Sequence, residues 1–194
     1  MSQPASYKPG RFFALASVLI AAVIAVDQYT KWLVLETMLR QKGDHPGFLD
    51  WFTTMRPVAQ FLDQQESYNK ITFSPWLDFV MVWNKGVSFG MFDSGNPMTT
   101  MRLIGFSLCV CMALLVWLVL ARSKLLSVAL PLMIGGALGN TIDRIRFSAV
   151  ADFIDVHVAQ RHWPAFNFAD SCICCGAVLL VLDTLINSTA KKAG

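Results

Sequence analysis

The sequence predicts an all-α membrane protein with four transmembrane helices, both termini in the cytoplasm, and a small β-hairpin on the outer face. Three observations predict this fold. Of the 194 residues, 55% are hydrophobic and 15% are charged, whereas about a quarter of a typical soluble domain is charged. Long apolar runs occur four times along the chain. Basic residues without acidic neighbours gather in three short segments that alternate with the longer connections.

The four apolar runs are the predicted transmembrane spans. Each approaches the roughly 20 residues that a helix needs to cross a bilayer. The first run could instead be a cleaved signal peptide because Lys8 and Arg11 precede it, but no convincing small-residue cleavage site follows. We expect one membrane domain over residues 1–194, with spans at residues 12–36, 101–121, 125–142 and 169–187.

Basic residues set the predicted orientation. The N-terminal segment, the turn between the second and third spans and the C-terminal tail together hold six basic residues and no acidic one. The positive-inside rule places these segments in the cytoplasm, so residues 37–98 and 143–168 lie outside. Arg144 and Arg146, near the outer end of the third span, argue weakly against this. The net charge of +3 reflects topology and gives no reason to expect nucleic-acid binding.

Small residues inside the spans have simple structural interpretations. Gly135 and Gly139 stand one helical turn apart, a spacing that lets transmembrane helices approach closely. The cysteines are expected to pack as small apolar side chains. A metal site is the alternative, but no histidine lies at the same depth, so we expect neither metal nor cofactor. The five cysteines are Cys109, Cys111, Cys172, Cys174 and Cys175.

The outer region contains a predicted β-hairpin. Residues 79–83 form a β-prone run, residues 84–86 supply turn chemistry, and residues 87–89 form a second short run. Four aromatic residues would lie at headgroup depth: Trp76, Trp83, Phe89 and Phe92. Such a hairpin could hold an extended peptide, or it could merely close the helix bundle.

Acidic residues cluster at one predicted membrane face. Asp143, Asp152, Asp155 and Asp170 fall within 28 residues, after a stretch without any acidic residue from position 94 to 142. Ionisable groups at a membrane boundary are costly unless they are paired or functional. Each of these aspartates is therefore a candidate functional residue.

Two of these aspartates lie in an Asn-x-x-Asp pattern. Asn140 precedes Asp143, and Asn167 precedes Asp170, in each case by three residues. This spacing places amide and carboxylate on one helix face. Asn167 follows Pro164 at the expected start of the fourth span and could be its N-cap, with Asp170 in the first turn. Capping alone would be the structural explanation.

Asp152 has the setting expected of a catalytic carboxylate. Its neighbours at positions 149–154 are apolar, and burial raises the pKa of a carboxyl group. Two close carboxylates cannot both ionise easily, so one can keep a proton and polarise a carbonyl while the other activates water. Asp143 is followed by Arg144 and is expected to form a local ion pair or to act as a hydrogen-bond brace. We expect no catalytic role for His157 or His162.

Three long motifs resemble a known family. Residues 135–144 read GGALGNTIDR, residues 150–155 read VADFID, and residues 164–171 read PAFNFADS. They are similar to the GGxxGNxxDR, (V)xDFI and PxFNxAD boxes of the lipoprotein signal peptidases (signal peptidase II). Two weaker boxes, DQYTK at 27–31 and VWNKGVSFG at 82–90, agree in order and position.

The resemblance implies a four-helix aspartic endopeptidase of the bacterial inner membrane. It would cut diacylglyceryl-modified prolipoproteins just before the lipidated cysteine, with membrane lipid around it and no metal, and a monomer is favoured. By matched position, Asp152 and Asp170 would be the catalytic pair, although Asp143 also matches a family box. The supporting, substrate-orienting or stabilising residues would be Asp27, Asn84, Asn140, Asp143, Arg144 and Asn167. Residues 41–70 are longer than the family pattern leads us to expect.

Two other functions compete with a peptidase. A proton-coupled carrier would place its acidic residues near the midplane and would show an internal repeat, whereas here the acids cluster at one face. A non-catalytic assembly factor would tolerate Asp152→Asn, and a peptidase would not.

Overall fold

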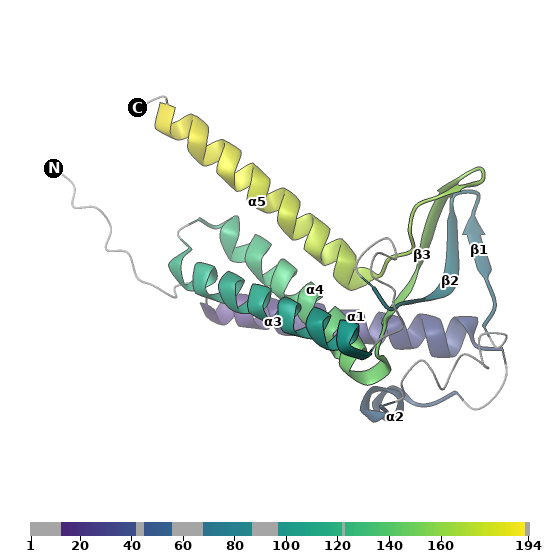
Figure 1. Ribbon diagram of the computed structural model, residues 1–194. Helices are drawn as coiled ribbons and strands as arrows, with labels where there is room; N and C mark the ends of the chain where they lie inside the picture. The colour runs from purple at the N-terminus through teal and green to yellow at the C-terminus, as the bar shows by residue number, and fades with distance from the viewer. Residues whose placement is uncertain (1–12, 42–44, 56–67, 87–96, 122, 193–194) are drawn as a thin grey trace.

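The computed structural model describes residues 13–41, 45–55, 68–86, 97–121 and 123–192. Helices dominate it, and a small sheet stands at one end of them (Figure 1). The first long helix ends in a π-helical segment, η1, that continues its course. The helical elements are α1 (Phe13–Trp32), η1 (Leu33–Leu39), α2 (Phe48–Thr53), α3 (Pro97–Leu120), α4 (Leu126–Phe147) and α5 (Phe168–Lys192).

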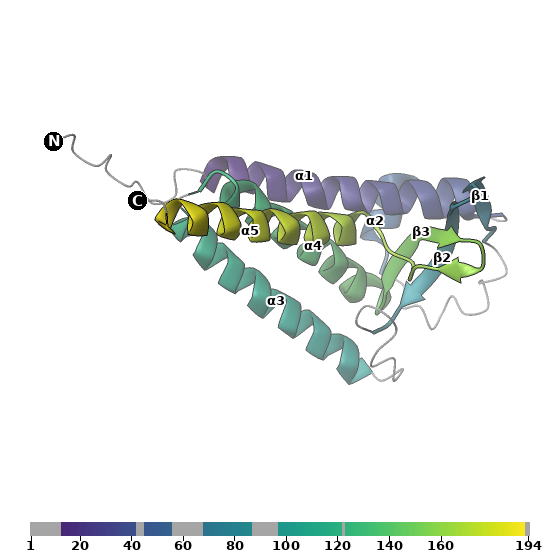
Figure 2. The ribbon, with the colours of Figure 1, turned by 90° about the horizontal axis from the view of Figure 1, so that it is seen from above.

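Four helices in the described part of the chain are long and apolar enough to cross a membrane, as predicted. They cover α1 with η1, α3, α4 and α5. The start of α1, the turn from α3 to α4 and the end of α5 lie at the end of the bundle away from the sheet (Figures 1 and 2). The first residues of α1 and the last residues of α5 therefore lie at the same end of the bundle.

The third span continues beyond the predicted end at residue 142. The α4 helix runs to Phe147 and stops at Ser148, whose backbone is left-handed with φ 61°. We expected residues 143–147 in an outer loop. They are helical, and side chains of this segment form buried contacts with the rest of the protein, as described below.

The α4 helix is the most buried of the four spans and packs against α1, α3 and α5. The predicted role of its small residues is confirmed. A Cβ at Gly135 would lie 2.7 Å from Cβ of Val23, and one at Gly139 would lie 2.6 Å from Oδ2 of Asp27. Both contacts are on α1, so these two glycines bring α4 and α1 together.

The sheet has four antiparallel strands in the order β1-β2-β3-β4. The first run of the predicted hairpin, residues 79–83, lies in β2, and its second run, residues 87–89, lies outside the described residues. The β2 strand pairs with β1 before it and with β3 on its other side, and the pairing with β3 was not predicted. The strands are β1 (Ile71–Ser74), β2 (Leu77–Asn84), β3 (Val150–Val158) and β4 (Arg161–His162).

The connection predicted as an outer loop over residues 143–168 thus contains a nine-residue strand, β3. Its first residues are almost fully buried, because Ala151 and Phe153 pack on an apolar core beneath the sheet. This core joins the sheet to the bundle. Its buried members are Val34, Leu35, Leu39, Trp51, Phe147, Ala149, Ala151 and Phe153.

After β4 the chain returns along β3. Phe166 donates its backbone N–H to the carbonyl oxygen of Ile154 at 3.1 Å and accepts from the N–H groups of Phe153 and Ile154. This pairing sets the next residue, Asn167, beside the start of β3, where α5 begins. Strand and helix therefore meet at the two predicted catalytic residues.

Candidate active site

The predicted site residues converge where β2, β3, α4 and α5 meet. Asn84, Asp152 and Asp170 line a cavity of about 500 Å³, whose other walls are the segment before α5 and the first turns of α5 itself. Asn84 and Asp170 also line a second cavity, of about 340 Å³, bounded by α3 and α4. Asn84 and Asp170 thus lie where the two cavities meet, and Asp152 faces the larger one.

Asp152 is held by two amides. Its Oδ2 accepts a hydrogen bond from Nδ2 of Asn84 at 3.0 Å, and its Oδ1 accepts one from Nδ2 of Asn167 at 2.8 Å. Asn84 reaches it because Val82 lies opposite Asp152 in the sheet, and residues two apart on a strand share a face. Burial above all, and then the nearby charge of Asp170, raise the pKa of Asp152 to about 7.

Asp170 is anchored at the start of α5 by a reciprocal cap. Its Oδ2 accepts from the backbone N–H of Asn167 at 3.2 Å, while Oδ1 of Asn167 accepts from the backbone N–H of Asp170 at 3.0 Å. This is the capping-box arrangement. The predicted N-cap is therefore present, and the same asparagine also binds the other carboxylate. Asn167 therefore both caps α5 and helps to build the site.

Asn140 connects the two halves of the site. Its Nδ2 donates to Oδ1 of Asp170 at 2.7 Å, and its Oδ1 accepts from Nδ2 of Asn167 at 3.1 Å. The amide of the first Asn-x-x-Asp motif, Asn140, therefore binds the aspartate of the second motif, Asp170. Every amide around the pair has a defined partner, so the carboxylates cannot rotate without breaking several bonds.

Of the two roles expected for Asp143, the ion pair with Arg144 was wrong, and the hydrogen-bond brace agrees with its bonds from Gln28 and Ala151. The cation beside Asp143 is Lys31, whose Nζ lies 2.7 Å from Oδ2 of Asp143 and 2.8 Å from Oδ2 of Asp27. All three side chains are fully buried. Residues 143 and 144 are neighbours on a helix and point in different directions, whereas α1 packs against this face of α4.

This buried network accepts hydrogen bonds from the backbone next to Asp152 and next to Asp170. Oδ1 of Asp27 accepts from the N–H of Ala169, which precedes Asp170, at 3.0 Å. Oδ2 of Asp143 accepts from the N–H of Ala151, which precedes Asp152, at 3.2 Å. Lys31 thus holds two carboxylates that each fix the residue before a candidate catalytic aspartate.

Gln28 completes the network. Its amide nitrogen donates to Oδ2 of Asp27 at 3.1 Å and to Oδ1 of Asp143 at 2.9 Å. Lys31 and Gln28 were not among the predicted site residues. The available signal was their position within the DQYTK motif, as polar residues inside an apolar run, because a buried charge in a span needs a partner.

The two arginines at the end of α4 form hydrogen bonds with other parts of the protein. Nη2 of Arg144 donates to the carbonyl oxygen of Gly86 at 3.0 Å, and its Nε is buried and forms no hydrogen bond with any described residue. The guanidinium of Arg146 lies 4.1 Å from the ring centroid of Trp51 and donates to Oε1 of Gln28 at 3.0 Å. Because both charges are held by protein groups, they say little about membrane orientation.

The arrangement offers the groups that hydrolysis of an amide bond requires. It offers one carboxyl group with a raised pKa, a second carboxylate, and fixed amide donors around both, which suits general acid–base catalysis on water and a carbonyl. Within the described residues, the one group of histidines, cysteines and acids able to hold a metal lies elsewhere, at the far end of β3.

A comparison with known families decides the assignment. The family model described as "Signal peptidase (SPase) II" matches residues 19–186, which include every site residue named above. The chain belongs to the signal peptidase II family.

Relatives in this family carry the name lipoprotein signal peptidase. One from Rhodopseudomonas palustris (strain TIE-1) is 34% identical over 190 residues, covering 95% of this chain and 98% of the relative. One from Polynucleobacter necessarius is 40% identical over 184 residues, covering 94% of each. A relative from Methylorubrum extorquens is 46% identical over 112 residues, but the match spans 66% of its length.

Solved structures agree on the fold. A bacterial membrane enzyme solved by the in meso method at 2.3 Å resolution superposes with a TM-score of 0.68 and 23% identity, covering 96% of both chains. A second bacterial membrane enzyme, solved at 1.9 Å resolution, gives a TM-score of 0.63. The four-helix bundle with its small sheet is thus a fold that this chain shares with these membrane enzymes.

Proposed function

We propose that this protein is a membrane aspartic endopeptidase that removes signal peptides from diacylglyceryl-modified prolipoproteins by cutting before the lipidated cysteine. One observation carries the proposal: Asp152 and Asp170, held by Asn84, Asn140 and Asn167, face one cavity at the sheet end of the helices. Family membership supports the substrate class, and the carboxylate pair supports the aspartic chemistry.

In the proposed reaction the pair shares one proton. Asp152, whose pKa is raised to about 7, is the protonated partner and donates its proton to the oxygen of the scissile carbonyl. The Asp170 carboxylate takes a proton from water as the water oxygen attacks the carbonyl carbon. The tetrahedral intermediate then collapses: the C–N bond breaks, Asp170 gives its proton to the leaving amine of the cysteine, and one hydroxyl proton of the intermediate returns to Asp152 as the carbonyl re-forms.

The two cavities suit a substrate with an apolar arm on each side of the cut. The smaller one is lined by apolar side chains of α3, α4 and α5, among them Phe106, Met133 and Ile173. The larger one is lined by Trp163, Phe166 and further residues of α5. We assign one to the apolar signal segment and the other to the diacylglyceryl chains, with the scissile bond at Asp170, where they meet.

The peptide to be cut must be extended, because helical carbonyls are engaged in i→i−4 hydrogen bonds. Asn84, at the end of β2, and Arg144, which lines the smaller cavity with it, would orient such a segment over the pair. No metal or cofactor is needed for this chemistry.

The proposed location is the bacterial cytoplasmic membrane, with both termini inside and the sheet and active site at the outer face. The charge pattern of the connections supports this orientation, and so does the position of the start of α1 and the end of α5 at the same end of the bundle (Figure 1). We propose that the protein works as a monomer.

The function is tested with purified protein and a diacylglyceryl-modified prolipoprotein in detergent micelles. Mass spectrometry should find a free signal peptide and a product beginning with the modified cysteine. The same precursor without the lipid is the matched control and should be cut far more slowly. Cleavage at another position, or equal cleavage of both precursors, would overturn the proposed substrate class.

A further inference from the structure

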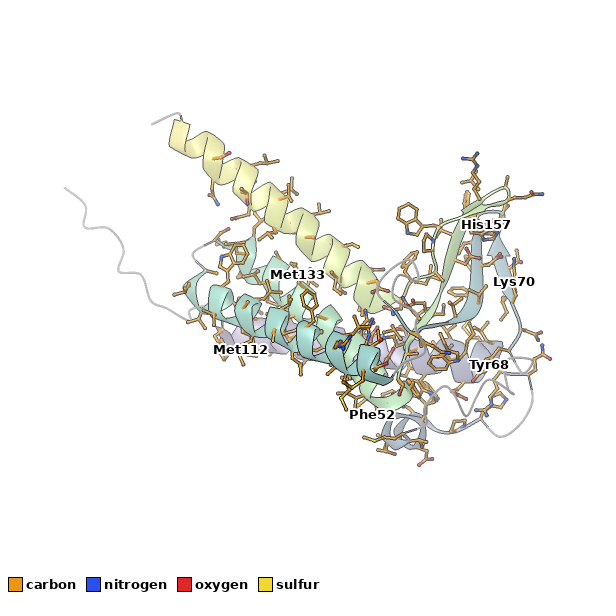
Figure 3. The ribbon with its side chains drawn as sticks, in the orientation of Figure 1. Phe52, Tyr68, Lys70, Met112, Met133 and His157 are labelled. Carbon is orange, nitrogen blue, oxygen red and sulfur yellow. The ribbon has the colours of Figure 1, made fainter. Side chains whose placement is uncertain are left out.

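A second cluster of reactive side chains lies on β3 and β4, at the far end of the sheet from the bundle. Asp155 and His157 are two residues apart on β3, so their side chains share one face. His162 on β4 lies directly opposite His157. Asp152 is three residues from Asp155, so it faces the other side of the sheet. The cluster is therefore separate from the active site (Figure 3 labels His157).

The ligand atoms of the cluster are already close. One atom each from Asp155, His157 and His162 can be chosen so that all lie within 4.8 Å of one another. Nδ1 of His162 lies 2.8 Å from Oδ2 of Asp155. Two ligands of one zinc ion, each about 2.0–2.2 Å from it, are at most about 4.4 Å apart. The ligand atoms would therefore have to come only slightly closer together to bind one ion, and the side chain of His162 is 47% exposed.

The surroundings of the cluster favour a cation. Asp78 on β2 lies directly opposite Asp155 on β3, and like charges in that position destabilise a sheet. Asp78 is 1% exposed and forms an ion pair with Lys70, which lowers the pKa of Asp78. Asp155 has no comparable lysine or arginine among the described residues; its charged contact there is His162.

Asp78 is also placed as an outer partner of His157. Nδ1 of His157 is buried, forms no hydrogen bond with any described residue, and lies 3.6 Å from Oδ2 of Asp78. Metal-bound histidines usually donate their other ring N–H to a carboxylate, which fixes the tautomer and raises the ligand's basicity. One ring nitrogen of His157 can therefore face Asp78 and the other a metal ion.

We propose that Asp155, His157 and His162 form a surface binding site for a divalent transition metal, with zinc as the expected ion. Imidazole nitrogens select such metals over Mg²⁺ and Ca²⁺, and three protein ligands leave a fourth position for water. The ion would tie β4 to β3 across a two-residue turn in which Ala159 has a φ of 53°. The site takes no part in peptide cleavage and does not depend on the proposed function.

The test is a Zn²⁺ titration of the full-length protein, without an affinity tag, by competition with a chromophoric chelator. We expect one saturable Zn²⁺ per chain. His162→Ala and Asp155→Asn should each weaken the affinity by at least about tenfold, since disturbing even an outer partner has this effect. His45→Ala, which changes the remaining histidine of the chain, is the matched control and should bind as the wild type does.

Two results would overturn the site. One is the absence of saturable Zn²⁺ binding. The other is unchanged affinity in His162→Ala, which would move the ion to the cysteines. Co²⁺ separates these cases, because a cysteine site gives intense thiolate-to-metal absorption and an imidazole–carboxylate site does not. Metal-free melting curves that match the wild type show that each variant is folded.

Discussion

Asp152→Asn should make the protein more stable at pH 8. Burial raises the pKa of Asp152 from 3.8 to about 7, and one pKa unit corresponds to about 1.4 kcal/mol. Holding the charged carboxylate in the folded protein therefore costs about 4 kcal/mol. Asparagine removes that cost but replaces one accepting oxygen by a donor, so one of the two amide bonds is lost, at about 1–2 kcal/mol. The net gain is about 2 kcal/mol.

The gain depends on pH in a defined direction. Since the pKa is raised in the folded state, the folded protein binds the proton more tightly than the unfolded chain does. Wild-type stability consequently falls as pH rises from about 4 to about 7, and the loss is complete above 7. At pH 5 Asp152 is protonated in the folded state, and the advantage of the variant should shrink by about 3 kcal/mol, which removes it.

Thermal melting in detergent at pH 8 and pH 5 measures this. For a chain of this size about 2 kcal/mol corresponds to a Tm increase of about 4–8 °C, expected at pH 8 and absent at pH 5. Asp50→Asn changes an exposed carboxylate and should leave Tm nearly unchanged at both values. The reasoning is refuted if Asp152→Asn melts at or below the wild type at pH 8, or if its advantage does not change with pH.

Three further results are expected. Lys31→Met leaves two buried carboxylates without their cation and should cost about 3–5 kcal/mol, seen as a lower Tm; an unchanged Tm would contradict the network. Gly136→Ala puts a methyl group 2.4 Å from the carbonyl oxygen of Ala169 and should cost about 1–3 kcal/mol or more, whereas Gly105→Ala, with open space around it, should be neutral or stabilising in the same melts. In a pH series of cleavage, kcat/KM should fall above about pH 7 as Asp152 loses its proton; a rate that keeps rising there would argue against a protonated pair.

The sequence predicted the parts of this protein that follow from local pattern. Four apolar runs became four helices with shifted ends, because span length is set by the bilayer. The Asn-x-x-Asp motif at residue 167 became a capping box, since capping depends on residues three apart. Gly135 and Gly139 met α1 for a similar reason: their spacing places both on one face.

Long-range pairing was not readable in the same way. The partner of Asp143 is Lys31, more than a hundred residues earlier, and the neighbour in sequence, Arg144, was the wrong choice. The strand β3 was missed because its start, residues 150–153, is buried on both faces and lacks the alternation of apolar and polar residues that marks a half-buried strand. Without β3, the partner of β2 could not be assigned.

The account depends most on Asp152 and Asp170 acting as a pair, and turnover of a lipid-modified prolipoprotein tests this most directly. Asp152→Asn and Asp170→Asn should each abolish cleavage while the variants remain folded in the membrane. Asp155→Asn, on the opposite face of the same strand, is the matched control and should keep near-normal turnover. Near-normal cleavage by either dyad variant would contradict the account.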